Sequence, residues 1–206
     1  PVAGDINYLG SGKLAGELNW TKLSIPDLTS AYGFQMKGGG SVTGRINFSL
    51  SDSKVETMSG TGLLALENAE LFSVPMFGPL TPLVGGVLND ENVGVQRAKD
   101  AFCTFEIKDG ILSTKDFQTS TNSLNFAGNG SVDMKEQTLD MTMRMNARGL
   151  LGIITRPLRP FSGLFQFRGT GPLKATQWES MKFTEPPETE NELLLTPPRA
   201  ELIPQQ

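Results

Sequence analysis

Apolar and polar side chains alternate along much of the chain, a pattern typical of β-strands with one apolar face. The stretch TLDMTMRMNAR, residues 138–148, places Leu139, Met141, Met143 and Met145 at every second position, with polar residues between them. A helix would scatter these four residues around its circumference, so the spacing predicts a strand whose methionines share one face. Contact with an apolar ligand and ordinary core packing both predict this alternation, and the pattern leaves both interpretations open.

Similar alternating runs recur along the chain to about residue 167. Between them, the turn-like sequences KDG (108–110), AGNG (127–130) and KEQ (135–137) predict antiparallel hairpins. We therefore predict a mainly β fold, a curved antiparallel meander sheet in the form of an open groove or half-barrel. The prediction is firmest between residues 101 and 148, where strands follow one another without interruption.

Two apolar segments depart from period two and predict one or two short helices, near residues 79–88 and 149–156. Arg148, Arg156 and Arg159 accompany the second segment, and an apolar helix beside arginines can lie on a membrane surface or hold a lipid head group. Alternatively, both helices cover one end of the sheet.

We expect three regions along the chain. We expect residues 1–59 to form the N-terminal strands of a β-groove and residues 60–183 to form a β-meander with the short helices. Residues 184–206 are rich in Pro and Glu, so we expect a tail that is mostly extended or disordered.

Composition removes several classes of function. The net charge of -4, from 18 basic and 22 acidic residues, gives no basic footprint for a nucleic-acid partner. Histidine is absent and Cys103 is the only cysteine, which excludes Ser/His and Cys/His nucleophile pairs, Cys-rich zinc sites and internal disulfides. We predict no metal and no cofactor, and we interpret Cys103 as a small buried apolar residue.

Glycine recurs in a Gly-x-Gly pattern before or within the alternating runs. It occurs at Gly10 and Gly12, Gly38 and Gly40, Gly60 and Gly62, Gly128 and Gly130, and Gly169 and Gly171. GTGLLA, with Gly60, Gly62 and Ala65, fits a dinucleotide-binding motif, but that motif needs a buried strand before it and a helix directly after it. Glycines at strand entries and bulges explain all five pairs together.

Paired carboxylates offer one enzymatic alternative, a hydrolase acting on envelope polysaccharide. The candidates are Asp109, Asp116, Asp133 and Asp140, which lie at turns or on the polar face of the predicted meander. Solvated surface charge is the ordinary explanation of such positions, and we predict that the protein is not an enzyme.

From Gly60 to about Trp178 the chain carries an ordered series of features: GTGLLALENAELFSVPMFGPL, then FCTFEIKDGILSTKDFQTSTNSLNFAGNGSVDMKEQTLDMTMRM, then LLGIITRPLRPF, and finally LFQFRGTGPLKATQW. This order resembles the C-terminal region of the AsmA-like envelope proteins. The match covers a little over half of the chain and consists mostly of alternation and glycines.

The resemblance implies a periplasmic protein, anchored to the inner membrane through a segment not present in this chain. It also implies membership of a bridge-like group that carries phospholipid toward the outer membrane along a long β-groove, with no catalytic residues. The expected partners are then phospholipid or another acyl lipid, together with a membrane surface or envelope proteins.

We therefore predict a non-enzymatic module that binds or conducts phospholipid along an apolar sheet face, with the helical segments closing or gating one end. The predicted lipid-contacting residues are Phe105, Ile107, Leu124, Phe126, Val132, Met134, Leu139, Met141, Met143, Met145, Phe165 and Phe167. The alternative is a structural or assembly scaffold of the envelope, with a packed core and a tail that binds a partner.

Overall fold

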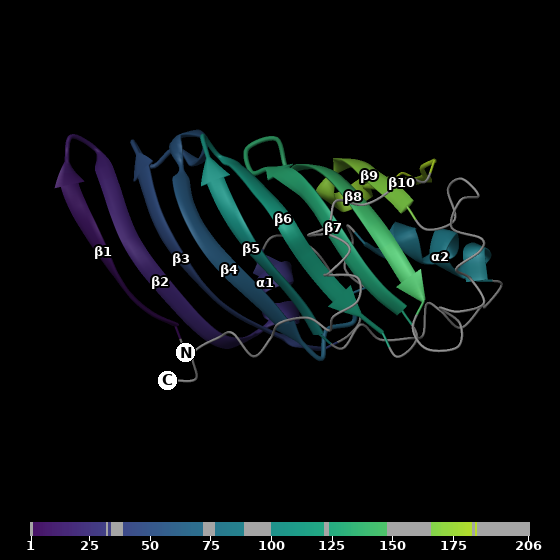
Figure 1. Ribbon diagram of the computed structural model, residues 1–206. Helices are drawn as coiled ribbons and strands as arrows, with labels where there is room; N and C mark the ends of the chain where they lie inside the picture. The colour runs from purple at the N-terminus through teal and green to yellow at the C-terminus, as the bar shows by residue number, and fades with distance from the viewer. Residues whose placement is uncertain are drawn as a thin grey trace.

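The computed structural model describes residues 2–31, 33, 39–71, 77–88, 100–121, 124–147, 166–182 and 184. Within these residues, ten strands form one antiparallel sheet in which every strand pairs with its neighbours in sequence, from β1 at one edge to β10 at the other (Figure 1). The sheet is not closed. This confirms the prediction of a mainly β, open antiparallel meander.

The strands are β1 (Val2–Gly10), β2 (Lys13–Ser24), β3 (Ser41–Ser51), β4 (Ser59–Glu67), β5 (Asp100–Lys108), β6 (Ile111–Ser120), β7 (Leu124–Asp133), β8 (Thr138–Ala147), β9 (Gln166–Pro172) and β10 (Gln177–Ser180). The described helices are α1 (Ile25–Ala31) and α2 (Thr81–Leu88), with short 3-10 turns η1 (Val55–Thr57), η3 (Gly78–Leu80) and η6 (Leu173–Ala175). Sheet pairing continues from β3 to β4 across the expected boundary at residue 59.

Two of the three predicted hairpin turns are confirmed. Asp109 and Gly110 turn the chain between β5 and β6, and residues 134–137 turn it between β7 and β8. The prediction of a turn at residues 127–130 is wrong, because these residues lie inside β7 and pair with both β6 and β8. Glycine there reflects close packing of neighbouring strands rather than a change of direction.

The predicted helix near residues 79–88 is confirmed by η3 and α2, which follow each other directly. Pro79 occupies the opening turn of η3, where its missing N–H is no loss because no earlier carbonyl is available to accept it. The predicted helix at 149–156 lies outside the described residues, and so does the expected tail apart from Thr184.

The register of the strands assigns each side chain to one of two faces. We call the face that bears Ile6, Trp20, Phe48 and Met143 the apolar face, and the opposite one the polar face. A single row of directly paired residues crosses nine strands on the apolar face without one polar side chain: Ile6, Gly16, Phe48, Gly60, Ile107, Leu112, Val132, Leu139 and Gly171.

Both described helices pack on the apolar face. Ile25 of α1 belongs to a cluster with Val42 of β3, against which Trp20 and Leu64 pack. Leu80 of η3 and Val84 of α2 belong to the main core, which includes the methionines of β8. The helices therefore lie on the side of the sheet where any apolar ligand would have to bind.

Candidate functional site

The methionine row of β8 lies on the apolar face, as its spacing predicted. Met141, Met143 and Met145 are 4%, 1% and 3% exposed. Across the sheet, Met143 is paired with Gly128 of β7 and Met141 with Gly130, so that the glycines leave space for the methionine side chains. The row therefore lines the interior of the molecule in this structure.

Most of the predicted lipid-contacting residues are brought together on this face and are buried. These are Phe105, Ile107, Leu124, Phe126, Leu139, Met141, Met143, Met145 and Phe167. Val132 shares the face but is only half-buried, Met134 lies just past the end of β7, and Phe165 is outside the described residues. The same holds for Arg148, Arg156 and Arg159, the predicted head-group contacts.

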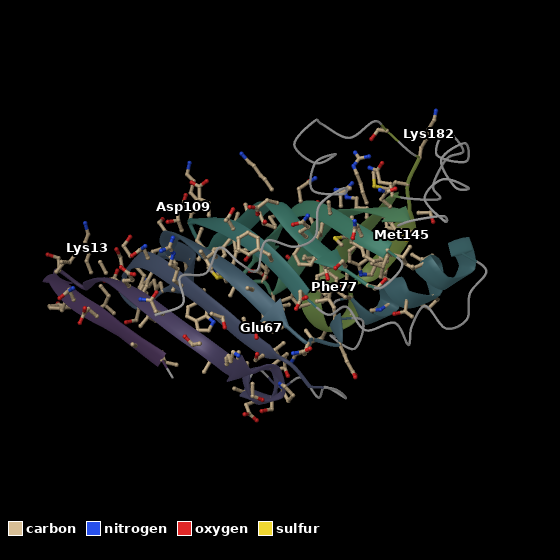
Figure 2. All side chains as sticks on the ribbon, turned by 60° about the horizontal axis from the view of Figure 1, so that its bottom comes forward. Lys13, Glu67, Phe77, Asp109, Met145 and Lys182 are labelled. Atoms are coloured by element: carbon tan, nitrogen blue, oxygen red, sulfur yellow. The ribbon has the colours of Figure 1, made fainter. Side chains whose placement is uncertain are left out.

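Part of the chain itself covers the methionine end of the apolar face. The ring of Phe77 stacks on Phe117 of β6 at a centroid distance of 5.6 Å and lies 6.2 Å from the ring of Trp178 of β10. Leu80 and Val84 are 1% and 0% exposed. Phe77 and Met145, both labelled in Figure 2, belong to the same buried cluster. We call strands β5–β10 of the apolar face the covered half.

Strands β1–β4 carry the same apolar face in a more exposed state, and we call them the open half. At the edge, Val2, Ile6 and Tyr8 of β1 are 60%, 57% and 69% exposed. Leu18 of β2 and Ile46 of β3 are half-buried. None of these belongs to the predicted contact residues, although the alternation in KLAGELNW and RINFSL is the signal that could have added Leu18 and Ile46.

The glycines inside the strands occupy positions on the apolar face where other residues would project a side chain. Their lack of a side chain lets neighbouring strands approach closely. A Cβ atom added at Gly60 would lie 2.2 Å from the carbonyl oxygen of Asn47, a distance that real Cβ atoms do not reach. Large side chains lean over other glycines, so that the ring of Phe105 covers Gly62. The Gly-x-Gly pairs of β4, β7 and β9 thus place two glycines on one face because their spacing matches the period of a strand.

The polar face is exposed toward one end of its strands, but toward the other end it is buried from β3 to β9, where Ala65, Phe102 and Gln118 are 0%, 6% and 1% exposed. Over β2–β5 it has a shallow depression of about 530 Å³, whose lining includes the side chains of Ser49 and Thr61. Over β8 and β9, by contrast, Arg144 and Gln166 are only 7% and 3% exposed. Arg144, which alternates with the methionines along β8, is therefore enclosed although it lies on the polar face.

Arg144 is buried because the chain after β10 folds back across it. Its guanidinium donates hydrogen bonds to Oε1 of Gln166 at 3.1 Å and to Oγ1 of Thr184 at 3.1 Å, and another to the Thr184 carbonyl oxygen. The Thr184 N–H in turn donates to Oε1 of Gln166 at 3.2 Å. These contacts anchor residue 184 over β8 and β9, on the face opposite the methionines.

Three of the four candidate carboxylates accept hydrogen bonds from neighbouring groups. Asp116, at an irregularity in β6, accepts hydrogen bonds from the Thr104 backbone N–H at 2.8 Å and its hydroxyl at 2.7 Å. Asp133 accepts bonds from the N–H groups of Lys135 and Glu136 in the following turn. The fourth candidate, Asp109, lies in the β5–β6 turn with a positive φ.

Asp140 and Arg168 form a two-bond ion pair on the polar face of β8 and β9, with N–O distances of 2.9 and 2.7 Å. The hydrogen bonds from Arg168 lower the pKa of the Asp140 carboxyl. Both side chains are about half exposed, so water screens the pair and we attribute little stability to it.

Cys103 of β5 is half-buried and packs against the core of the covered half. Burial, with a smaller contribution from the negative charge of Asp116, raises the pKa of its thiol to about 12. A neutral thiol of this kind behaves as a small apolar side chain and is a poor nucleophile.

Among the described residues, no helix is long and apolar enough to span a membrane, and no group of acidic or cysteine side chains could hold a metal ion. No protein-family model matches the sequence, and neither a curated protein nor a solved structure matches it. The candidate site is thus defined by its own geometry: one apolar face, covered over β5–β10 and more exposed over β1–β4.

Proposed function

We propose that this protein is a non-enzymatic lipid-binding module whose apolar sheet face contacts the acyl chains of phospholipid. The observation that carries the proposal is the row of apolar residues and glycines that crosses nine strands without a polar side chain. The apolar face extends beyond the strands on which the described helices pack. Here the face continues to β1, where Ile6 is more than half exposed.

The geometry suits a flexible apolar ligand in two respects. A strand of eight residues spans roughly 25 Å, which is comparable to an extended acyl chain. Methionine side chains can repack around a ligand of no fixed shape, because they are unbranched and have several rotatable bonds. The resemblance to the C-terminal region of AsmA-like proteins supports the same proposal, which then includes a periplasmic location, an inner-membrane anchor outside this chain, and phospholipid transport for outer-membrane biogenesis.

A second candidate function is a structural or assembly scaffold of the envelope. One observation favours it: the methionine row is packed beneath Phe77, Leu80 and Val84 and is nearly inaccessible. In a scaffold this packing would be permanent, and the exposed apolar residues of β1 would serve contact with another protein.

Titration with a fluorescent phospholipid distinguishes the two functions. We expect saturable binding that is lost in Ile6→Glu and retained in Asn7→Glu. The two residues are adjacent and exposed, but project from opposite faces of β1, so the second variant controls for charge and for the edge position. Equal binding by both variants, or none by the unaltered protein, would contradict lipid contact at this face.

Native mass spectrometry of the protein purified from cells, followed by lipid extraction, provides an independent measurement. A phospholipid that co-purifies with about one or more molecules per chain would support lipid binding. A ligand-free mass from a cooperatively folded protein that ignores added lipid would favour the scaffold.

A further inference from the structure

The segment that covers the methionine row is held by a narrow apolar contact. Phe77, Leu80 and Val84 are spaced by three and four residues and form one helical stripe against the sheet. The ring of Phe77 packs against the rings of Phe117 and Trp178. The stripe therefore contacts the apolar face in the way that the acyl chain of a lipid would.

The local sequence gives this segment little stability of its own. α2 has only eight residues, TPLVGGVL, of which two are glycines and none is charged. Glycine is the least favourable residue in a helix interior after proline, and short helices depend on packing rather than on propensity. The N-cap residue of η3, Phe77, makes no side-chain capping hydrogen bond. Among its described side chains, the segment is held mainly by the burial of Phe77, Leu80 and Val84, with Leu83 packed against the same core.

The surface below the segment can adapt to another occupant. The main core joins Met141, Met143 and Met145 to Phe77, and methionine repacks more readily than branched or aromatic residues. The open half of the same face adjoins this surface through the directly paired residues Gly60 and Ile107, so an acyl chain could pass from one half to the other without crossing a polar side chain.

We propose that residues 77–88 are a displaceable lid, and that an acyl chain binds beneath it in the place now taken by Phe77, Leu80 and Val84. This inference rests on the proposed function and adds that access to one part of the lipid-binding face is regulated. The lid and the acyl chain compete for one surface, so lipid binds there only when the lid is displaced. The apparent dissociation constant for lipid therefore rises as the fraction of molecules with a seated lid increases.

Phe77→Ala tests the competition directly, with 11-(dansylamino)undecanoic acid as the fluorescent acyl probe. We expect the dissociation constant to fall by roughly tenfold or more, because the lid loses its largest contact. Phe102→Ala is the matched control: Phe102 is 6% exposed against 7% for Phe77, but packs on the polar face with Leu63 and Ala65. We expect this control to lose stability without tighter probe binding.

The two tryptophans of the chain report where the probe binds. Trp178 lies beside Phe77 in the covered half, and Trp20 lies on β2 in the open half. In a Trp20→Phe background, quenching of Trp178 by the dansyl group reports entry beneath the lid. In a Trp178→Phe background, quenching of Trp20 reports contact with the open half.

Each outcome separates the lid from the proposed function. Stronger Trp178 quenching in Phe77→Ala, with Phe102→Ala unchanged, supports the lid. Quenching of Trp20 alone, with no effect of Phe77→Ala, overturns the lid and leaves lipid binding standing. No quenching of either tryptophan in any variant overturns both. If Phe77→Ala does not fold, the smaller truncation Val84→Ala is expected to tighten binding in the same direction and takes its place.

Discussion

Ile6 and Ile107 are the same residue type, on the same face and in the same paired row of the sheet, yet they are 57% and 3% exposed. The alternation that creates the face is common to both, so the difference between them lies in the groups that surround each side chain. In the covered half, η3 and α2 complete a core around the methionines. In the open half, the same pattern leaves apolar side chains accessible at β1. Alternation therefore specifies a face, whereas burial depends on segments elsewhere in the sequence.

The largest expected effect tests this comparison with one substitution in each half of the face. Ile107→Ala should lower the free energy of unfolding by about 2–5 kcal/mol, because it leaves a cavity in a packed core. Ile6→Ala should change it by only about 0.5 kcal/mol, since an exposed side chain loses little on truncation. Urea denaturation of both variants measures the difference. Similar losses at the two positions would show that the open half is covered as well.

The backbone of the open half should prove as sensitive as that of the covered half, despite its exposed side chains. Gly60→Ala should cost about 1–3 kcal/mol, because its Cβ would collide with the Asn47 carbonyl oxygen and push β3 and β4 apart. Gly39→Ala is the control, since nothing lies within 4 Å of a Cβ at that position. Thermal unfolding followed by circular dichroism compares the two. A neutral Gly60→Ala would show that the strands are less closely packed than the structure indicates.

The sheet was predictable from sequence because each strand carries its own period-two pattern and most turns carry their own residues. This local rule alone was enough to predict that the methionines share one face of a strand. The helix α1 was missed, although Ser24, Pro26 and Asp27 form a recognisable helix start; the Asp27 N–H donates to the Ser24 hydroxyl at 3.4 Å. Its seven residues show too little periodicity to stand out between two strands.

The local alternation could not predict which parts of the face are covered. The burial of Met143 depends on Phe77, which lies more than sixty positions earlier in the chain. The burial of Arg144 depends likewise on Thr184, and nothing in the local alternation signals that an arginine on the polar face will be enclosed. Long-range contacts of this kind follow from topology rather than from the period of one strand.

The smallest expected effect locates the border between the two halves, at Cys103. Burial raises the pKa of this thiol from 9.0 to about 12 in the folded protein, so between these values the folded state keeps a proton that the unfolded state loses. Stability should therefore be unaffected by Cys103 below pH 9 and should fall above it, by at most about 1.4 kcal/mol per pH unit. Urea denaturation at pH 8 and pH 10 measures this fall, and Cys103→Ala removes the thiol while leaving every other titrating group in place. If the unaltered protein and Cys103→Ala lose equal stability between the two pH values, the thiol is accessible to water and the open half extends to β5.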